Sequence, residues 1–364
     1  MISSEVSRNR SRALIQKLIQ KYKLDLTGLA VFTEAATGIY KYTSIIAALA
    51  GARHVYAFAA DSGYGKKEEV KDQTLLEAAI LNIDDRITVI FNKENNYLSQ
   101  SDIITNSGFV RPITSEMISN MKATAVIPLM WLVSEFRPDE LDIKACVQKG
   151  ILVMGTDEHH PLLRLFDTIG FKICKLLFEA GLSVYNDNYL LISSGDMGNS
   201  IADFLINNQI SFDRVVFDEL TPVNHMKYVR SKKEIVFSLN KYDAIIIAEL
   251  YHDIDILSST GFISTKLLKE QNPLIQIIHT YGSVKVSDIN KVELSIFPEK
   301  PRNFPYGTVC ADYLGEKPTL DLIIAGLKVG EVMARCRLNG MNLNEAEKYT
   351  LDHSPADAFK NLFV

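Results

Sequence analysis

Short apolar runs alternate with amphipathic segments along most of the chain. Strands that are buried on both faces and separated by helices are typical of a parallel, doubly wound α/β sheet. An N-terminal amphipathic segment leads directly into the first run. The apolar runs of the first half lie at 28–33, 54–60, 87–91, 102–105, 123–129 and 151–154.

The second half repeats this pattern after a helical stretch from 162 to 180. Its apolar runs lie at 189–192, 215–217, 244–250, 274–278 and 292–297. We therefore expect an α/β protein with two Rossmann-like, doubly wound parallel-sheet domains joined by crossing helices. Residues 1–160, with the C-terminal helical segment 320–364, are predicted to form the substrate domain. Residues 161–319 are predicted to form an NAD-binding domain.

The stretch 189–205 has the pattern of a strand, a phosphate-binding turn and a helix. Its turn reads S-x-G-x-x-G, so Ser193 stands where the usual G-x-G-x-x-G has its first glycine. Gly195 would let the backbone approach a pyrophosphate, and Gly198 would let the helix pack close to the strand. Asp196 places a negative charge near that phosphate, or it caps the helix.

An acid downstream favours NAD as the cofactor. Asp218 follows an apolar run about 20 residues after the turn, where a ribose diol would be held. No arginine directly follows it to accept a 2′-phosphate, so NAD is favoured over NADP. An ordinary β-α-β unit with a glycine turn is the alternative. The predicted cofactor-binding residues are Ser194, Gly195, Asp196, Met197, Gly198, Asp218, Ala248 and Thr280.

Composition narrows the choice of partners and compartment. The 364 residues are ample for two domains. A net charge of −5 does not indicate the basic surface that nucleic-acid-binding proteins carry. No apolar run approaches the roughly 18 residues of a membrane span. The four cysteines are far apart and read as reduced thiols, with no metal-binding spacing. We expect a cytoplasmic protein with a small-molecule substrate, and a homodimer, which is common in this architecture.

Two polar stretches of the first domain follow predicted strands. Glu34 comes directly after the first run, with Tyr40 and Lys41 close behind it. An acid and an amine there could share a proton or bind a zwitterionic substrate. The alternative is a helix-capping acid beside a solvated lysine.

The second stretch, Asp157-Glu158-His159-His160, follows the last run of the first domain. Histidine suits proton transfer near neutral pH, and a neighbouring carboxylate could tune it. Capping of a helix start is the alternative. A metal is disfavoured because contiguous residues rarely point at one ion.

Four segments have an order found in one known family. Residues 139–153 are similar to the stretch that leads into the last strand of that family's first domain, and 193–202 to its phosphate loop. Residues 277–282 resemble the strand that ends at its catalytic arginine, and 297–301 the segment with its catalytic glutamate. The chain thus resembles the D-isomer-specific 2-hydroxyacid dehydrogenases. This resemblance implies two Rossmann-like domains, crossing helices and NAD.

The departures from this family concern its chemistry. Tyr281 stands in place of the substrate-binding arginine, residues 303–309 contain no histidine, and only Glu299 matches. The fold and the cofactor are therefore implied by the resemblance, whereas the family's reaction is not. His279 and Tyr281 are alternate strand residues that would share a face near the nicotinamide. Tyr281 donates a hydrogen bond to a substrate there, or it fills space.

We expect an NAD-dependent oxidoreductase for a small polar, amino-acid-like or biosynthetic metabolite. Residues 43–52 and 61–62 also resemble S-adenosylhomocysteine hydrolase, which implies as an alternative a hydrolase or lyase that uses tightly bound NAD transiently. A non-catalytic dinucleotide-binding sensor or assembly subunit is the third alternative. The predicted catalytic residues are Glu34, Lys41, His159 and Tyr281, and the predicted substrate-binding residues are Tyr40, Asp157, Glu158 and His279.

Overall fold

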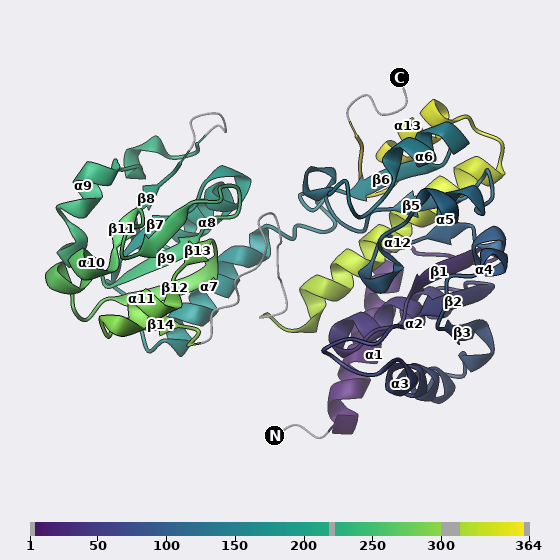
Figure 1. Cartoon of the computed structure of the whole chain (residues 1–364), viewed down its shortest axis with the longest axis horizontal. Helices are drawn as coiled ribbons and strands as arrows, with labels where there is room; N and C mark the ends of the chain where they lie inside the picture. The colour runs from purple at the N-terminus through teal and green to yellow at the C-terminus, as the bar shows by residue number, and fades with distance from the viewer. Residues whose placement is uncertain (1–3, 218–222, 300–313, 360–364) are drawn as a thin grey trace. The chain divides into compact units, whose positions relative to one another are not determined.

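The chain folds into two compact units in the computed structural model, which describes residues 4–217, 223–299 and 314–359. The first unit combines Met1–Arg164 with Glu316–Val364, and the second is Leu165–Gly315 (Figure 1). The second unit is therefore an insertion in the first. Each boundary lies four residues from the position predicted by the sequence pattern, at 164 rather than 160 and at 315 rather than 319.

The first unit is built on a seven-stranded sheet. Its strands are β1 (Ala30–Glu34), β2 (His54–Phe58), β3 (Ile87–Ile90), β4 (Ile103–Ile104), β5 (Val126–Pro128), β6 (Leu152–Thr156) and β15 (Ala356–Asp357). Their order in the sheet is β15-β6-β5-β4-β1-β2-β3. The neighbours from β6 to β3 are all parallel, and β15 is antiparallel to β6. The chain leaves β1 in one direction for β2 and returns to its other side for β4, so the topological switch point lies between β1 and β4.

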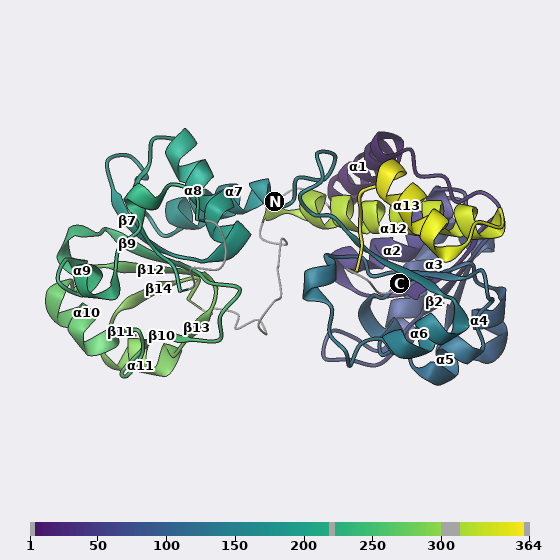
Figure 2. The same cartoon turned by 90° about the horizontal axis from the view of Figure 1, so that it is seen from above.

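Helices cover both faces of this sheet. Those with assigned bounds are α1 (Ser4–Tyr22), α2 (Tyr42–Leu49), α3 (Lys67–Ile80), α4 (Asn95–Gln100), α5 (Ser115–Ser119), α6 (Ile143–Lys149), α12 (Glu316–Leu338) and α13 (Leu343–His353). Figure 2 shows α1, α2, α12 and α13 on one face and α4, α5 and α6 on the other. The second face is closed by a core that includes Phe32, Leu98, Ile104 and Ile127.

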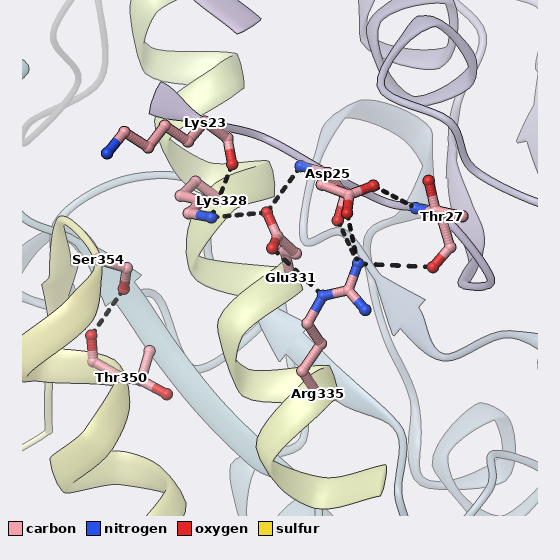
Figure 3. A network of polar contacts seen from close by, with 8 residues as sticks. All are labelled: Lys23, Asp25, Thr27, Lys328, Glu331, Arg335, Thr350 and Ser354. Atoms are coloured by element: carbon pink, nitrogen blue, oxygen red, sulfur yellow. Dashed lines mark hydrogen bonds and ion pairs between the residues drawn. The ribbon is translucent and has the colours of Figure 1, made fainter. Parts of the chain in front are cut away.

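A polar network fastens α12 to the segment that follows α1 (Figure 3). The buried Glu331 carboxylate accepts the Asp25 N–H at 3.0 Å and also binds Lys328 and Arg335. Arg335 donates to the Asp25 carbonyl oxygen at 2.7 Å, and Lys328 donates to the carbonyl oxygen of Lys23. These contacts tie the C-terminal part of the chain to its N-terminal part within one unit.

The second unit contains two sheets. Its strands are β7 (Asn188–Ile192), β8 (Ser211–Val215), β9 (Ala244–Ala248), β10 (Asp255–Ser258), β11 (Ile263–Ser264), β12 (Gln276–Tyr281), β13 (Ser283–Val284) and β14 (Ser295–Phe297). The main sheet is parallel, in the order β14-β12-β9-β7-β8, and the smaller one has the order β11-β10-β13. The switch point of the main sheet lies between β7 and β9.

Two helices cover one face of the main sheet and three cover the other (Figure 2). The first group is α7 (Asp167–Glu179) and α8 (Gly195–Asn207). The second is α9 (Lys232–Val236), α10 (Thr265–Gln271) and α11 (Val286–Lys291). A core that includes Ile192, Ile245, Ile277 and Leu268 is completely buried between the sheet and the second group.

The predicted α/β class with two parallel-sheet domains is confirmed, and the differences are local. The strand expected at 215–217 is β8, which ends at Val215, because the Phe217 N–H bonds the Ser194 hydroxyl instead of a strand. The helix expected from 162 begins at Asp167, after a turn in which Leu163 and Arg164 donate to the His160 carbonyl oxygen. The three-stranded sheet and β15 were not predicted.

Two further expectations concern the membrane and the thiols. Within the described ranges, no helix is long and apolar enough to cross a membrane. Cys146, Cys174 and Cys336 are free thiols, and Cys310 lies outside the described residues.

Candidate functional site

The β7–α8 loop, defined as residues 193–198 and so including the first turn of α8, follows β7, an inner strand of the main sheet of the second unit. Gly195 has φ +60°, a left-handed conformation that favours glycine, and a Cβ there would overlap the ring of Tyr251. A Cβ on Gly198 would overlap the Ser193 carbonyl oxygen and the Arg214 guanidinium. Both glycines are therefore required by close approaches. At Gly198 this is the close packing of helix and strand that the motif predicts, whereas at Gly195 the close neighbour is the Tyr251 ring.

The first turn of α8 lacks a side-chain cap. Its N-cap residue, Ser194, makes no capping hydrogen bond, because its hydroxyl accepts the Phe217 N–H at 3.0 Å. The first N–H groups of a helix have no partner within the helix, and they attract anions. Gly195 and Met197 are buried in this turn, whereas the Asp196 side chain is exposed.

Arg214 lies beneath the loop. Its side chain comes from β8 and is 1% exposed. Among the described residues, it is the largest side chain that is fully buried. Nε donates to the Ser193 carbonyl oxygen at 2.9 Å, and Nη1 donates to Asn199 Oδ1 at 2.9 Å. Burial lowers the pKa of Arg214 to about 10, and the nearby Glu249 carboxylate opposes this shift. The guanidinium is thus charged at neutral pH.

A carboxylate holds the other side of the loop. Glu249, which directly follows β9, is 2% exposed and accepts the Ser194 N–H at 2.8 Å. It also accepts the Tyr251 N–H at 2.9 Å and contacts His252 Nδ1 at 3.0 Å. These bonds place Tyr251 where its ring packs on Gly195.

These residues fit the diphosphate of a dinucleotide, with one condition. The uncapped turn of α8 and the Arg214 guanidinium favour an anion at Gly195. The Ser194 N–H is already used by Glu249, and the Tyr251 ring occupies the space over Gly195. A diphosphate therefore fits once this ring has turned away.

The remaining predicted cofactor residues border the same strands. The Ala248 carbonyl oxygen accepts the Ser193 hydroxyl at 2.7 Å, and the Thr280 hydroxyl donates to the Ile247 carbonyl oxygen at 3.1 Å. Both residues are buried, and these two hydrogen bonds connect neighbouring strands of the main sheet. Asp218 lies outside the described residues.

Tyr281, at the end of β12, is paired with a lysine. Lys172 comes from α7, and its Nζ lies 3.2 Å from the Tyr281 hydroxyl and 4.6 Å from the centre of the ring. Lys172 is 6% exposed and Tyr281 2% exposed. A phenol beside an ammonium group is a proton donor with a cation that stabilises its ionised form.

His279 lies two residues before Tyr281 on β12. Its Nε2 atom donates to the Gly282 carbonyl oxygen at 2.8 Å, which leaves Nδ1 as the acceptor of a neutral ring. Burial lowers the pKa of His279, the Gly282 hydrogen bond opposes this, and Lys172 lowers it further. Lys172 thus acts on both predicted residues of this strand.

In the first unit, Glu34 ends β1 and is 4% exposed. Burial raises the pKa of its carboxyl to about 7, against the effects of Arg111, Ser107 and Thr43. Thr43 lies at 3.5 Å from the carboxyl group. The cation that acts on Glu34 is therefore Arg111, and not Lys41 as the sequence suggested.

The two neighbours expected beside Glu34 have other contacts. Lys41 Nζ lies 4.8 Å from the centre of the Tyr42 ring. The Tyr40 side chain is 51% exposed, and its carbonyl oxygen accepts the Thr43 hydroxyl at 3.0 Å. These contacts of Lys41 and Tyr40 do not involve the Glu34 carboxyl group.

The stretch after β6 forms a turn. Asp157 Oδ1 accepts the His159 N–H at 2.9 Å, and the Asp157 N–H donates to the Pro355 carbonyl oxygen. His159 is exposed, whereas Glu158 is 1% exposed. Burial raises the pKa of Glu158, Glu135 raises it further, and a backbone hydrogen bond from Leu132 opposes this.

Three charged residues, Lys172, Arg214 and Glu249, were not predicted as part of the site. Lys172 lies between Phe171 and Ile173, which is a signal for a buried charge, whereas Arg214 directly follows Asp213 in β8 and gives no such signal. Glu249 follows an unbroken apolar strand. Among the described residues, no group of three or more His, Cys, Asp or Glu side chains could hold a metal ion.

Comparison with known proteins finds similarity in structure alone. No family model and no curated protein matches the sequence. A dipicolinate synthase chain from Bacillus subtilis is similar with a TM-score of 0.51 and 11% identity, over 87% of this chain and 99% of that chain. A dipicolinate synthase chain from Bacillus halodurans has a TM-score of 0.49 and 12% identity, over 86% of this chain and 99% of that chain. D-lactate dehydrogenase with NAD+ from Lactobacillus jensenii has a TM-score of 0.48 and 11% identity, over 87% of this chain and 99% of that chain.

The chain from Bacillus subtilis is the one of these three with a TM-score above 0.5, and it is similar over most of the length of this chain. At these identities the similarity shows the fold, with two Rossmann-like domains. The predicted resemblance is confirmed at that level.

Proposed function

We propose that the protein is an NAD-dependent oxidoreductase that acts on a small polar metabolite. The observation that carries this proposal is the β7–α8 loop, where a left-handed Gly195, an uncapped helix and the buried Arg214 together favour a diphosphate. A bound nicotinamide would supply the hydride acceptor or donor.

The chain's own residues would hold the nucleotide and manage the proton. The first turn of α8 would bind the diphosphate, and Arg214 would add positive charge from beneath. Tyr281 would hold a proton at its hydroxyl oxygen, with Lys172 Nζ at 3.2 Å stabilising the ionised phenol. The bond to the Gly282 carbonyl oxygen would fix the orientation of the neutral His279 ring.

Isothermal titration with NAD, NADH, NADP and NADPH tests the proposal. We expect binding of NAD and NADH, and weaker binding of the two phosphorylated forms. Gly195→Arg should abolish binding, because an arginine side chain fills the space over the loop. The matched control is Gly63→Arg, in the first unit, where a side chain meets open space.

The thermal unfolding of both variants is measured alongside, so that loss of binding is not confused with loss of fold. A folded wild-type protein that binds none of the four nucleotides overturns the proposal. Equal binding by wild type and a folded Gly195→Arg variant removes the β7–α8 loop as the site.

A further inference from the structure

Buried polar atoms without hydrogen-bond partners gather at one edge of the first unit. Among the described residues, six buried side-chain nitrogen or oxygen atoms have no partner. Five of the six lie in residues at the carboxyl ends of first-unit strands or in the helix that follows one. They are Ser44 Oγ, both polar atoms of Asn106, Thr156 Oγ1 and Glu158 Oε2.

The topology brings these residues to the same sheet edge. Asn106 follows β4, and Ser44 lies in the first turn of α2, which follows β1. Thr156 is the last residue of β6, and Glu158 comes two residues later. Because β1, β4, β5 and β6 are parallel neighbours, their carboxyl ends meet at one edge, which includes the switch point.

These atoms are costly where they are. Ser44, Asn106 and Thr156 are 0% exposed and Glu158 is 1% exposed. A buried polar group without a partner destabilises a fold, and native proteins keep few of them. Proteins keep such groups where function requires them, as in a site that a ligand completes.

Hydroxyl groups at this edge contact one another and the Glu34 carboxyl group. Ser107 contacts the Thr105 hydroxyl at 2.8 Å, and Thr105 contacts the Thr33 hydroxyl at 2.7 Å. Ser107 also bonds the Glu34 carboxyl group. Hydroxyls and a carboxamide can both donate and accept, so they suit a ligand with both kinds of group.

Burial disfavours the charged forms of four acids at this edge, Glu34, Glu135, Glu158 and Asp357, and raises the pKa of each. Both arginines nearby are engaged by one carboxylate, since Arg111 lies 2.6 Å and Arg137 3.3 Å from Glu140. The acids at the edge are therefore not fully offset by them, and a cationic group beside these acids would favour their charged forms.

We propose that this edge, with Asn106 at its centre, binds a small primary amine that also carries hydroxyl or carbonyl groups. The ammonium group would meet the Glu34 carboxyl group, and its polar neighbours would satisfy Asn106 and Ser44, whose chain neighbours Ser107 and Thr43 contact that carboxyl group. The site lies within the first unit. Its binding step does not require a nucleotide.

Calorimetric titration without nucleotide tests the site, with ethanolamine and L-serinamide as probes. Ethylene glycol and glycolate are the matched compounds without an amine. We expect millimolar or tighter binding of the amines, a rise in the melting temperature with them, and neither effect with the other two. Because no nucleotide is present, failure here is distinct from failure of NAD binding.

Asn106→Leu separates a ligand site from a structural one. Replacing an unpartnered buried amide by an apolar group of similar size should raise the melting temperature of the free protein by about 2–4 °C. The same variant should weaken amine binding at least tenfold. If Asn106 instead holds internal water as a structural element, the substitution lowers the melting temperature and the proposal fails.

Two gentler variants keep the test decisive if Asn106→Leu does not fold. Ser44→Ala and Thr156→Val each remove an unpartnered hydroxyl with little change in volume. Ser44→Ala should weaken amine binding several-fold, whereas Thr156→Val, at the end of β6, should change it little. Asn96→Leu, at an exposed position of α4, is the control that should bind like wild type. Absence of amine binding in the wild type, or unchanged binding in the folded Asn106→Leu and Ser44→Ala variants, overturns the proposal.

Discussion

The guanidinium of Arg214 donates to the carbonyl oxygen of Ser193 from beneath, at a distance of 2.9 Å between Nε and O. The same side chain reaches Asn199 with Nη1, so it ties the end of β7 to the first turns of α8. Ser193 stands where the usual motif has a glycine, and a buried cation lies below it. The loop is thus held by a side chain from the next strand.

Arg214→Met should weaken both the fold and nucleotide binding. The variant leaves the buried Ser193 carbonyl oxygen and the Asn199 side chain without the guanidinium donor, which costs roughly 1–3 kcal/mol in the free energy of unfolding. The affinity for NADH should fall at least tenfold. Chemical denaturation and isothermal titration measure the two effects. Unchanged affinity in a folded variant would show that Arg214 serves the fold alone.

Glu249→Gln should strengthen nucleotide binding. In the wild type, Oε2 accepts the Ser194 N–H and Oε1 accepts the Tyr251 N–H, so the amide oxygen of the variant can keep one of these two bonds, while the negative charge beside the diphosphate is removed. We expect a gain of about 1 kcal/mol, or roughly fivefold in the NADH dissociation constant. The gain should shrink in high salt. Weaker binding of NADH would instead mean that the carboxylate contacts the nucleotide.

Tyr281→Phe and Lys172→Met should each slow hydride transfer without loss of NADH affinity. The pair supplies the proposed proton donor, and such groups contribute on the order of 10²–10⁴-fold to rates. Single-turnover kinetics with a substrate found by screening gives the rate, and titration gives the affinity. Tyr185→Phe, at a side chain 77% exposed, is the control. Wild-type rates in both pair variants would remove this role.

Glu34 should make the first unit less stable as the pH rises from about 4.5 to about 7. Its folded pKa is raised to about 7 by burial, against an ordinary value of 4.5. In that interval the unfolded chain releases the proton and the folded chain retains it, so stability falls as pH rises and levels off above 7. The difference amounts to about 3 kcal/mol.

Glu34→Gln isolates this effect, because it removes one titrating group and leaves the other acids in place. The free energy of unfolding of wild type minus that of the variant, measured at several pH values, should fall by that amount between pH 4.5 and 7. A flat difference contradicts the raised pKa of Glu34.

Glu331→Gln should destabilise the first unit by about 2 kcal/mol, because the buried carboxylate accepts the Asp25 N–H from outside α12 and pairs with Lys328 and Arg335 of the same helix. Thermal unfolding measures the loss. Glu68→Gln, at a side chain 63% exposed, is the control and should change stability by less than about 0.5 kcal/mol. Equal effects of the two substitutions would show that the network in Figure 3 adds little.

The strands of both main sheets could be predicted because parallel strands are buried on both faces and read as continuous apolar runs. β15 could not, since two residues carry no period and its place depends on pairing with Thr156 and Gly155. The same holds for the short strands β11 and β13. The glycine turn was predicted from its motif, because close backbone approaches restrict the residue type.

The charged residues around the site were harder to predict. The partners of Arg214 include a backbone carbonyl oxygen 21 residues earlier in the chain. Glu249 bonds an N–H group 55 residues away. Neither partner leaves a mark in the sequence, since every residue type carries those backbone atoms.

The insertion of one unit within the other has a consequence for biosynthesis. Residues such as Leu320, Ile324 and Leu327 of α12 are 0% exposed in the first unit, yet they leave the ribosome after the whole second unit. We expect the inserted unit to become protease-resistant first, although it is second in the sequence. Pulse proteolysis of ribosome-bound chains that end at Gly315 tests this order. Resistance of residues 1–164 in such chains would contradict it.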